Sequence, residues 1–159
     1  MKQNKILIFS YHYPPDQSAG ANRIFNLVRV FNKKVPNAKI YIFCSKPNRY
    51  IKKTIPLSCK SFGNIYIKRF WIPPLFSNAY FSALSYSFYF IQALIFSIFI
   101  RPEITIATSA KLLTAVLGMF SSFINKSDYF VDIRDTFVDN YFYFYRWKKR
   151  IILIGFLAY

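Results

Sequence analysis

The sequence is poor in acidic residues, glycine, cysteine and histidine, and these shortages exclude several kinds of site. Its 159 residues include six acids, four glycines, two cysteines and one histidine. A structural zinc site takes four nitrogen or sulfur ligands, so Cys44, Cys59 and the distant His12 predict no metal site. The lone His12 is more typical of a loop residue with satisfied hydrogen bonds than of a catalytic triad.

Three motifs of common nucleotide and acyl chemistry are also missing. The sequence contains no G-x-x-x-x-G-K-[ST], no G-x-G-x-x-G and no G-x-S-x-G. These patterns place glycine where a phosphate or a reacting carbonyl approaches the backbone. Their absence argues against P-loop chemistry and ordinary dinucleotide binding, and we expect no cofactor.

The two cysteines and the first residues indicate a cytoplasmic protein. Cys44 and Cys59 have no C-x-x-C spacing, and we interpret both as reduced thiols. The apolar run KILIFS near the N-terminus is too short for a secretory signal, and Pro14 and Pro15 interrupt the chain soon after it.

What the chain does contain is positive charge together with many apolar and aromatic residues. The net charge is +16, with 54% hydrophobic and 21% aromatic residues, a composition that excludes a disordered chain. The first 70 residues hold fourteen lysines and arginines against one acid, Asp16. Nucleic acid, an anionic membrane surface or a phosphorylated substrate would each fit this charge, as would a plain solvated surface.

Alternating apolar segments predict an α/β fold. Short apolar or alternating runs predict strands at Lys5–Ser10, Lys39–Cys44, Asn64–Phe70, Glu103–Thr108 and Tyr129–Ile133. Helical spacing of apolar residues predicts helices after Gly20, over Asn78–Ile100, over Ser109–Ile124 and from Phe137 onward. Strands that alternate with helices form a parallel sheet with helices on both faces. We therefore expect a Rossmann-like sheet, with a loop over Ser45–Ser61.

The segment Asn78–Ile100 has no charged residue and admits two interpretations. About twenty apolar residues are enough to cross a bilayer, which would make the chain a small integral membrane protein. Serine, glutamine and tyrosine side chains along the segment favour a helix that packs on the sheet and touches lipid. We predict the packed helix, and the membrane anchor is the alternative.

Three runs together resemble the family 4 retaining glycosyltransferases of the GT-B type. They are FSYHYPPDQSAGANRIFNLVRVF, ITIATSAKLLTAVLG and YFVDIRD, and they follow one another in the family's order at similar spacing. The resemblance covers nearly the whole chain. It is strongest to bacterial enzymes similar to those that build O-antigens, capsules and colanic acid.

The resemblance implies two Rossmann-like domains with an active site between them. In that family the N-terminal domain mainly holds the acceptor, and the C-terminal domain holds most of the nucleotide-sugar donor with an acidic E-x7-E motif. This sequence contains no such motif and no second domain. Residues 1–159 are therefore expected to be an N-terminal, acceptor-side domain. The apolar run that stops at Tyr159 suggests that even this domain is incomplete.

Carried over position by position, the resemblance places a donor-facing turn after the first strand. Ser18-Ala19-Gly20 matches the family's glycine-rich turn, which approaches the donor diphosphate, although one glycine stands where relatives often carry two. Arg23 follows in the first turn of the next helix and is a candidate for binding a phosphate bidentately. Asp16 is a candidate ligand for an acceptor hydroxyl. The plain alternatives are a helix-start glycine, a solvated arginine and ordinary Pro-Pro-Asp turn chemistry.

A second turn is expected to face the donor sugar. Arg134-Asp135 falls where many relatives carry a histidine-containing turn, and an I-R-D run is usual in the subgroup of colanic-acid and O-antigen enzymes. Arg134 would then neutralise charge on the leaving diphosphate, and Asp135 would orient a sugar hydroxyl. Asp135 could equally cap a helix that starts near Thr136. The family's Leu-Trp-Pro after this turn is replaced by Thr136-Phe137-Val138, which changes the expected shape of the sugar pocket.

Together these features predict a hexosyltransferase fragment. The expected reaction moves a hexosyl unit from a nucleotide-diphosphate sugar to a lipid-linked acceptor in surface polysaccharide biosynthesis. The expected place is the inner face of the cytoplasmic membrane, where the basic first half would meet anionic lipid. Residues 1–159 alone are expected to be inactive, because the donor-binding half of the cleft is missing. One alternative is an integral membrane protein. The other is a basic nucleic-acid binder, but the sequence lacks a nucleic-acid recognition motif.

Overall fold

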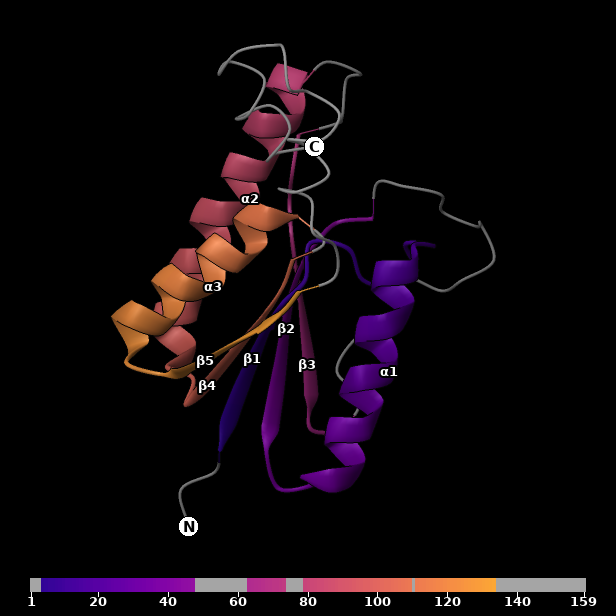
Figure 1. Ribbon diagram of the computed structural model, residues 1–159, viewed down its shortest axis with the longest axis vertical. Coiled ribbons are helices and arrows are strands. Elements are labelled where there is room, and N and C mark those ends of the chain that lie inside the picture. Colours follow the sequence, from indigo (N-terminus) through magenta and orange to yellow (C-terminus); the bar gives the residue numbers. More distant parts are fainter. Residues whose placement is uncertain (1–3, 48–62, 74–78, 110, 134–159) are drawn as a thin grey trace.

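A computed structural model describes residues 4–47, 63–73, 79–109 and 111–133 of the chain. These residues form a three-layer α/β/α arrangement with a parallel sheet in the middle (Figure 1). The strands are β1 (Lys5–Phe9), β2 (Lys39–Ser45), β3 (Ile65–Phe70), β4 (Ile104–Thr108) and β5 (Asp128–Asp132). The helices are α1 (Ala19–Lys34), α2 (Ala79–Ile100) and α3 (Leu112–Asn125). The predicted Rossmann-like α/β class is confirmed.

Strand β1 lies at the centre of the sheet and sets its topology. The order is β3-β2-β1-β4-β5, every neighbouring pair is parallel, and β3 and β5 form the edges. Lys5 pairs with Lys39 of β2, and Ile6 pairs with Ile104 of β4. The chain moves outward from β1 to β3 and then returns to start β4 on the other side of β1. This reversal puts a topological switch point between β1 and β4, where open α/β sheets bind ligands.

Alternate side chains of β1 enter two separate cores, one on each face of the sheet. Ile6 and Ile8 belong to the core under α1, and Leu7 and Phe9 belong to the core under α2 and α3. All four side chains are buried. The strand is apolar without alternation because both of its faces are covered.

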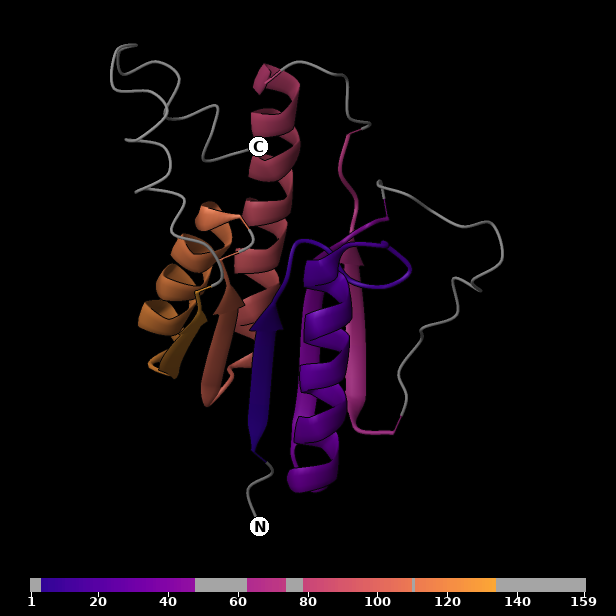
Figure 2. The same ribbon diagram turned by 45° about the vertical axis from the view of Figure 1, so that its right-hand side comes forward.

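Among the described elements, α1 covers one face of the sheet, and α2 and α3 cover the other (Figure 2). Ile24 and Val28 of α1 are buried against the sheet, and Leu27 and Phe31 lie partly buried beside them. Their three- and four-residue spacing places these side chains on one side of the helix. The rest of α1 carries no acid and four exposed cations, which are Arg23, Arg29, Lys33 and Lys34. The helix is therefore apolar toward the sheet and basic toward solvent.

Helix α2 packs on the opposite face, next to α3. Tyr86, Tyr89 and Ala93 are buried in the core, and the Tyr89 hydroxyl donates a hydrogen bond to the Phe43 carbonyl at 2.9 Å. The outward side of α2 is apolar as well, and Phe99 is 76% exposed. By length and composition alone, one stretch of the described chain, residues 83–100 with a mean hydropathy of 1.8, would also be able to cross a membrane.

Most predicted boundaries are correct within a few residues, and the exceptions have local causes. Ser45 extends β2 because its N–H and its hydroxyl donate to a carbonyl of the β1–α1 loop, at 3.0 and 2.8 Å. Helix α3 begins at Leu112 rather than at Ser109, because the Ser109 N–H donates to a β5 carbonyl and continues the sheet. The helix predicted from Phe137 lies outside the described residues, as does most of the loop predicted over Ser45–Ser61.

Gly118 lets α3 lie close against β4 and β5. A Cβ atom at this position would come within 2.6 Å of the Ala107 Cβ and 2.8 Å of the Tyr129 ring. Real Cβ contacts are almost never so short, so any side chain here must push the helix away from the sheet. The absence of a side chain at this position therefore sets how closely the helix approaches.

We expect Gly118→Ala to lower the free energy of unfolding by about 1–3 kcal/mol, because overpacking outweighs the better helix propensity of alanine. Adding Ala107→Gly should restore part of that loss, since it removes the nearer of the two contacts. Urea denaturation followed by circular dichroism measures both effects. Unchanged or raised stability of the single variant would show that α3 does not approach β4 as described.

Candidate functional site

The carboxyl ends of β1 and β4 meet at the switch point, and a helix starts after each of them. The β1–α1 loop runs from Ser10 to Ser18, and Ser109 and Lys111 lie between β4 and α3. Helix N-termini present backbone N–H groups and the positive end of the helix dipole. Two of them at one edge of the sheet suit an anion such as a phosphate or diphosphate, and this edge between β1 and β4 is the candidate crevice.

The β1–α1 loop is held in shape by its own polar groups. The Ser10 hydroxyl donates to the His12 carbonyl at 2.7 Å, and the Asp16 N–H donates to the Tyr13 carbonyl at 3.2 Å. His12 Nδ1 lies 3.1 Å from Asp16 Oδ2, and Asp16 is 2% exposed. The Pro14-Pro15 peptide bond is cis. This geometry supports the turn role considered for Asp16, and its role toward an acceptor stays a prediction.

Ser18 caps helix α1, which changes the shape expected for the glycine turn. Its hydroxyl accepts a hydrogen bond from the Ala21 N–H at 3.0 Å, and its backbone is extended. Ala19 and Gly20 therefore lie in the first helical turn and not in the loop before it. Gly20 is thus a helix-start glycine, and the approach of a diphosphate to this N-terminus stays a prediction.

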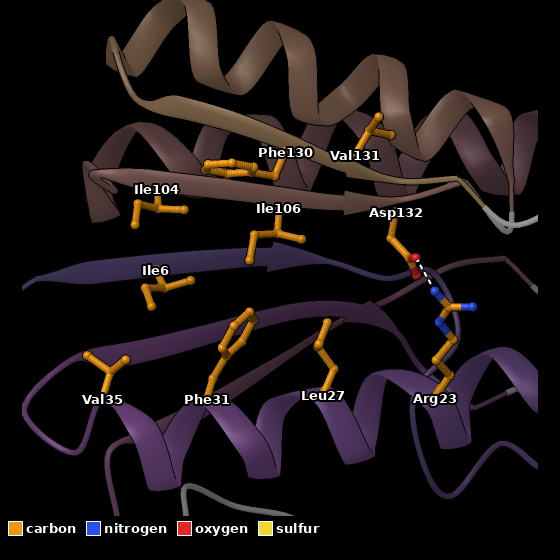
Figure 3. Close-up of a pocket in the computed structure, with 10 residues that line it drawn as sticks. All are labelled: Ile6, Arg23, Leu27, Phe31, Val35, Ile104, Ile106, Phe130, Val131 and Asp132. Carbon is orange, nitrogen blue, oxygen red and sulfur yellow. Dashed lines mark hydrogen bonds and ion pairs between the residues drawn. The ribbon is translucent and has the colours of Figure 1, made fainter.

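Arg23 joins the start of α1 to the end of β5. Its Nη2 donates to Asp132 Oδ1 at 2.6 Å, between residues 109 positions apart in the sequence (Figure 3). The Arg23 side chain is 60% exposed, and that of Asp132 is 16% exposed. Arg23 is therefore an ion-paired residue on the rim of the crevice. The sequence analysis did not single out its partner Asp132.

Arg134 and Asp135, the predicted sugar-facing pair, lie outside the described residues. Asp132 is the last residue of β5. Its ion pair with Arg23 shows that β5 ends at the edge of the sheet where α1 begins. The chain therefore leaves β5 at the rim where Ser18-Ala19-Gly20 starts α1. The positions of Arg134 and Asp135 themselves stay predictions.

Lys111 is a candidate site residue that the sequence analysis missed. It occupies the N-cap position of α3 without forming a side-chain cap, and it is buried. Its Nζ lies 4.5 Å from the ring centre of Tyr11 and 5.9 Å from that of Tyr86. A cation at a helix N-terminus opposes the helix dipole, and an anion in the crevice would offset that repulsion. The available signal was a lysine directly before an apolar helical run, where serine, threonine or an acid is usual.

Three tyrosines form an aromatic cluster beside Lys111. Tyr11 stacks on Tyr86 with ring centres 5.4 Å apart and meets Tyr89 edge-on at 5.2 Å. Burial raises the pKa of the Tyr86 and Tyr89 hydroxyls well above the ordinary value, so both stay neutral at physiological pH. The Tyr86 hydroxyl lies 3.2 Å from the Thr114 hydroxyl and is hydrogen-bonded to it. Neutral hydroxyls of this kind cannot serve as general bases at neutral pH.

The described residues at this edge therefore combine two cations, Lys111 and Arg23, with the N-termini of two helices. Two carboxylates lie there as well, Asp16 beside His12 and Asp132 in the ion pair with Arg23. Within the described residues, no group of three His, Cys, Asp or Glu side chains is placed to hold a metal ion. Such an arrangement can bind and orient an anionic substrate.

We expect Arg23→Gln and Asp132→Asn to be coupled by about 0.5–1 kcal/mol in a double-mutant cycle, because solvent screens this largely exposed pair. Urea unfolding measures the coupling, which should shrink as the salt concentration rises. The same cycle with Arg29→Gln, whose guanidinium lies over the Phe25 ring, should give no coupling. Equal coupling in both cycles would contradict the position of β5 beside the start of α1.

Comparison with known proteins adds no family to this picture. No family model matches the sequence, and no curated protein matches it. The case for a function therefore depends on the parallel sheet and on the helix N-termini, Lys111 and Arg23 at its carboxyl edge.

Proposed function

We propose that residues 1–159 form the acceptor-side, N-terminal domain of a retaining glycosyltransferase that uses a nucleotide-diphosphate sugar. One observation carries this proposal: two helix N-termini, Lys111 and Arg23 converge at one edge of a parallel sheet. The diphosphate of such a donor is the kind of group that helix N-termini and cations stabilise. The resemblance of three runs to GT-B enzymes supports a sugar donor over a dinucleotide.

Within this proposal the described residues bind and orient the substrates. The N-termini of α1, at Ser18-Ala19-Gly20, and of α3, at Lys111, flank the diphosphate from opposite faces of the sheet. The resemblance assigns the sugar side to Arg134 and Asp135, which follow β5 in the sequence. A hexosyl unit then passes to a lipid-linked acceptor at the same edge. In the GT-B pattern a second domain holds most of the donor, so residues 1–159 bind it weakly and do not turn it over alone.

We expect a nitrogen-15 NMR titration with nucleotide-diphosphate sugars to shift the backbone amides of Ser18–Arg23 and of Leu112–Thr114. Lys111→Gln should weaken binding about tenfold, which corresponds to ~1.4 kcal/mol for one charged contact. Lys126→Gln is the matched control, because Lys126 ends α3 at the opposite edge of the sheet and should not affect binding.

Two results would contradict the proposal in different ways. Turnover of a nucleotide sugar by the 159-residue chain would contradict the division of the active site between two domains. Equal losses of nucleotide-sugar affinity in Lys111→Gln and Lys126→Gln would show that the crevice is not the binding site. NAD should bind no better than the nucleotide sugars, because the chain lacks G-x-G-x-x-G.

The peripheral membrane contact expected for this enzyme can involve one side of the molecule at a time. The four cations of α1 lie on one face of the sheet, and the uncharged helix α2 lies on the other (Figure 1). A flat bilayer can contact only one of these layers. We place the α1 side against anionic lipid at the inner face of the cytoplasmic membrane, since each basic residue near such a surface gains about 1 kcal/mol.

We expect alkaline carbonate to release the protein from membranes, because α2 is packed on the sheet through Tyr86, Tyr89 and Ala93. Anionic vesicles should bind the protein with an affinity that falls steeply with salt, and Arg29→Gln should weaken this binding more than Phe99→Gln. Resistance to carbonate would favour an integral protein anchored by α2. Salt-sensitive binding to random-sequence DNA without binding to vesicles would favour a nucleic-acid binder.

A further inference from the structure

A groove runs along α1 on the basic side of the molecule and is open beside β4 and β5 (Figure 3). It encloses about 530 Å³, which lies within the range of ligand pockets. Helix α1 supplies one wall through Leu27 and Phe31, which are four residues apart and share one side of the helix, and Val35 continues this wall just after the helix ends. The strands supply the rest of the lining, chiefly Ile6, Ile104, Ile106 and Phe130.

The groove is apolar along its length and charged at one end. The Arg23–Asp132 ion pair lies at the end that meets the carboxyl edge of the sheet (Figure 3). From Arg23 to Val35 the helix rises ~18 Å, at about 1.5 Å per residue. Phe130 lines the groove and is 57% exposed, so a hydrocarbon occupant would remove apolar surface from water.

We propose that this groove binds the hydrocarbon chain of a phosphorylated lipid, with the phosphate at the Arg23 guanidinium. The inference rests on the proposed function, and it deepens that function by assigning a place to the lipid of the acceptor. Such a lipid matches the groove, because both have charged groups at one end and a long apolar part. The phosphate then lies at the edge of the sheet, next to the crevice for the sugar donor.

The charge around the groove favours a lipid over a second copy of the chain. Helix α1, which forms one wall, carries Arg23, Arg29, Lys33 and Lys34 and no acid. These cations complement anionic head groups. A second copy would bring another strongly basic surface to the groove, because the whole chain has a net charge of +16, and like charges oppose such contact.

Arg23 can hold a phosphate without leaving Asp132. A guanidinium has five N–H donors, and the hydrogen bond to Asp132 comes from Nη2. The side chain is 60% exposed, so a ligand can reach it from solvent. Asp132 thereby fixes the guanidinium at the end of the groove, where it pairs with the head group of a lipid.

The test measures binding of single-chain alkyl phosphates to the 159-residue chain, below the concentration at which the lipids form micelles. Affinity should rise about threefold to fourfold with each added methylene group until the groove is filled, and then level off. Alkyl phosphates should bind at least tenfold more tightly than alcohols of the same length. Arg23→Gln should remove most of that difference, and Lys126→Gln, at the opposite edge of the sheet, should preserve it.

Two variants inside the groove test its apolar part. Leu27→Asp should weaken binding at least tenfold, whereas Val30→Asp, at a 47% exposed position outside the groove, should leave it nearly unchanged. Because Leu27 is partly buried, Phe130→Asp on the edge strand provides a second test. Its control is Phe123→Asp, at an 83% exposed position on α3. Thermal unfolding identifies the variants that remain folded.

Saturable, length-dependent binding that the groove variants weaken and the control variants preserve supports the proposal. Equal losses in groove and control variants, or an affinity independent of chain length, would overturn it. Self-association without lipid that Phe130→Asp abolishes would also overturn it, by assigning the groove to a second copy. If alkyl phosphates do not bind while nucleotide sugars still shift the crevice amides, the lipid proposal is wrong and the donor site stands. If alkyl phosphates bind and nucleotide sugars shift no crevice amide, the donor site is wrong and the lipid groove stands.

Discussion

The burial of β1 on both faces, with a hydrogen-bonded strand on each edge, is the constraint from which the candidate site follows. Its alternate side chains need cover on opposite faces, so α1 lies on one side of the sheet and α2 and α3 lie on the other. Because β1 is parallel to β2 and β4, the helices that follow β1 and β4 start at the same edge. Apolar packing within the strands thus brings cations from distant parts of the sequence to one crevice.

The two helix layers differ in chemistry, and the difference organises the proposed roles. The α1 layer is basic and leaves a groove beside β4 and β5. The α2–α3 layer is built from helices without charged residues and has an apolar outer surface. A lipid in the groove would reach the sugar-transfer edge along α1, while the second layer holds the sheet and the aromatic cluster beneath Lys111. The proposed lipid groove and the proposed donor crevice would then be adjacent at Arg23, which borders both of them.

The strands and helices could be predicted because burial produces long local patterns, such as the unbroken run KILIF and the apolar stripe of α1. Element ends were harder, because they depend on single long-range hydrogen bonds such as those of Ser45 and Ser109. At the candidate site, the sequence predicted that Ser18 and Arg23 lie around the start of the first helix, and the structure places them there. It could not indicate that Ser18 caps its own helix or that Arg23 is bound by a β5 carboxylate, since that contact requires the position of β5. Lys111 was missed because its aromatic neighbours come from two other segments.

The outer edge of β5 has a consequence for the protein in solution. No other strand among the described residues pairs with that edge, and Phe130 and Val131 beside it are 57% and 40% exposed. An open apolar edge is a template onto which a further strand can be added, from the same chain or from a neighbouring molecule. The high positive charge makes separate molecules repel one another. The edge of β5 could therefore accept another strand, but repulsion opposes pairing between molecules. Polyvalent anions that neutralise the charge would release this restraint and favour growth of the sheet across molecules.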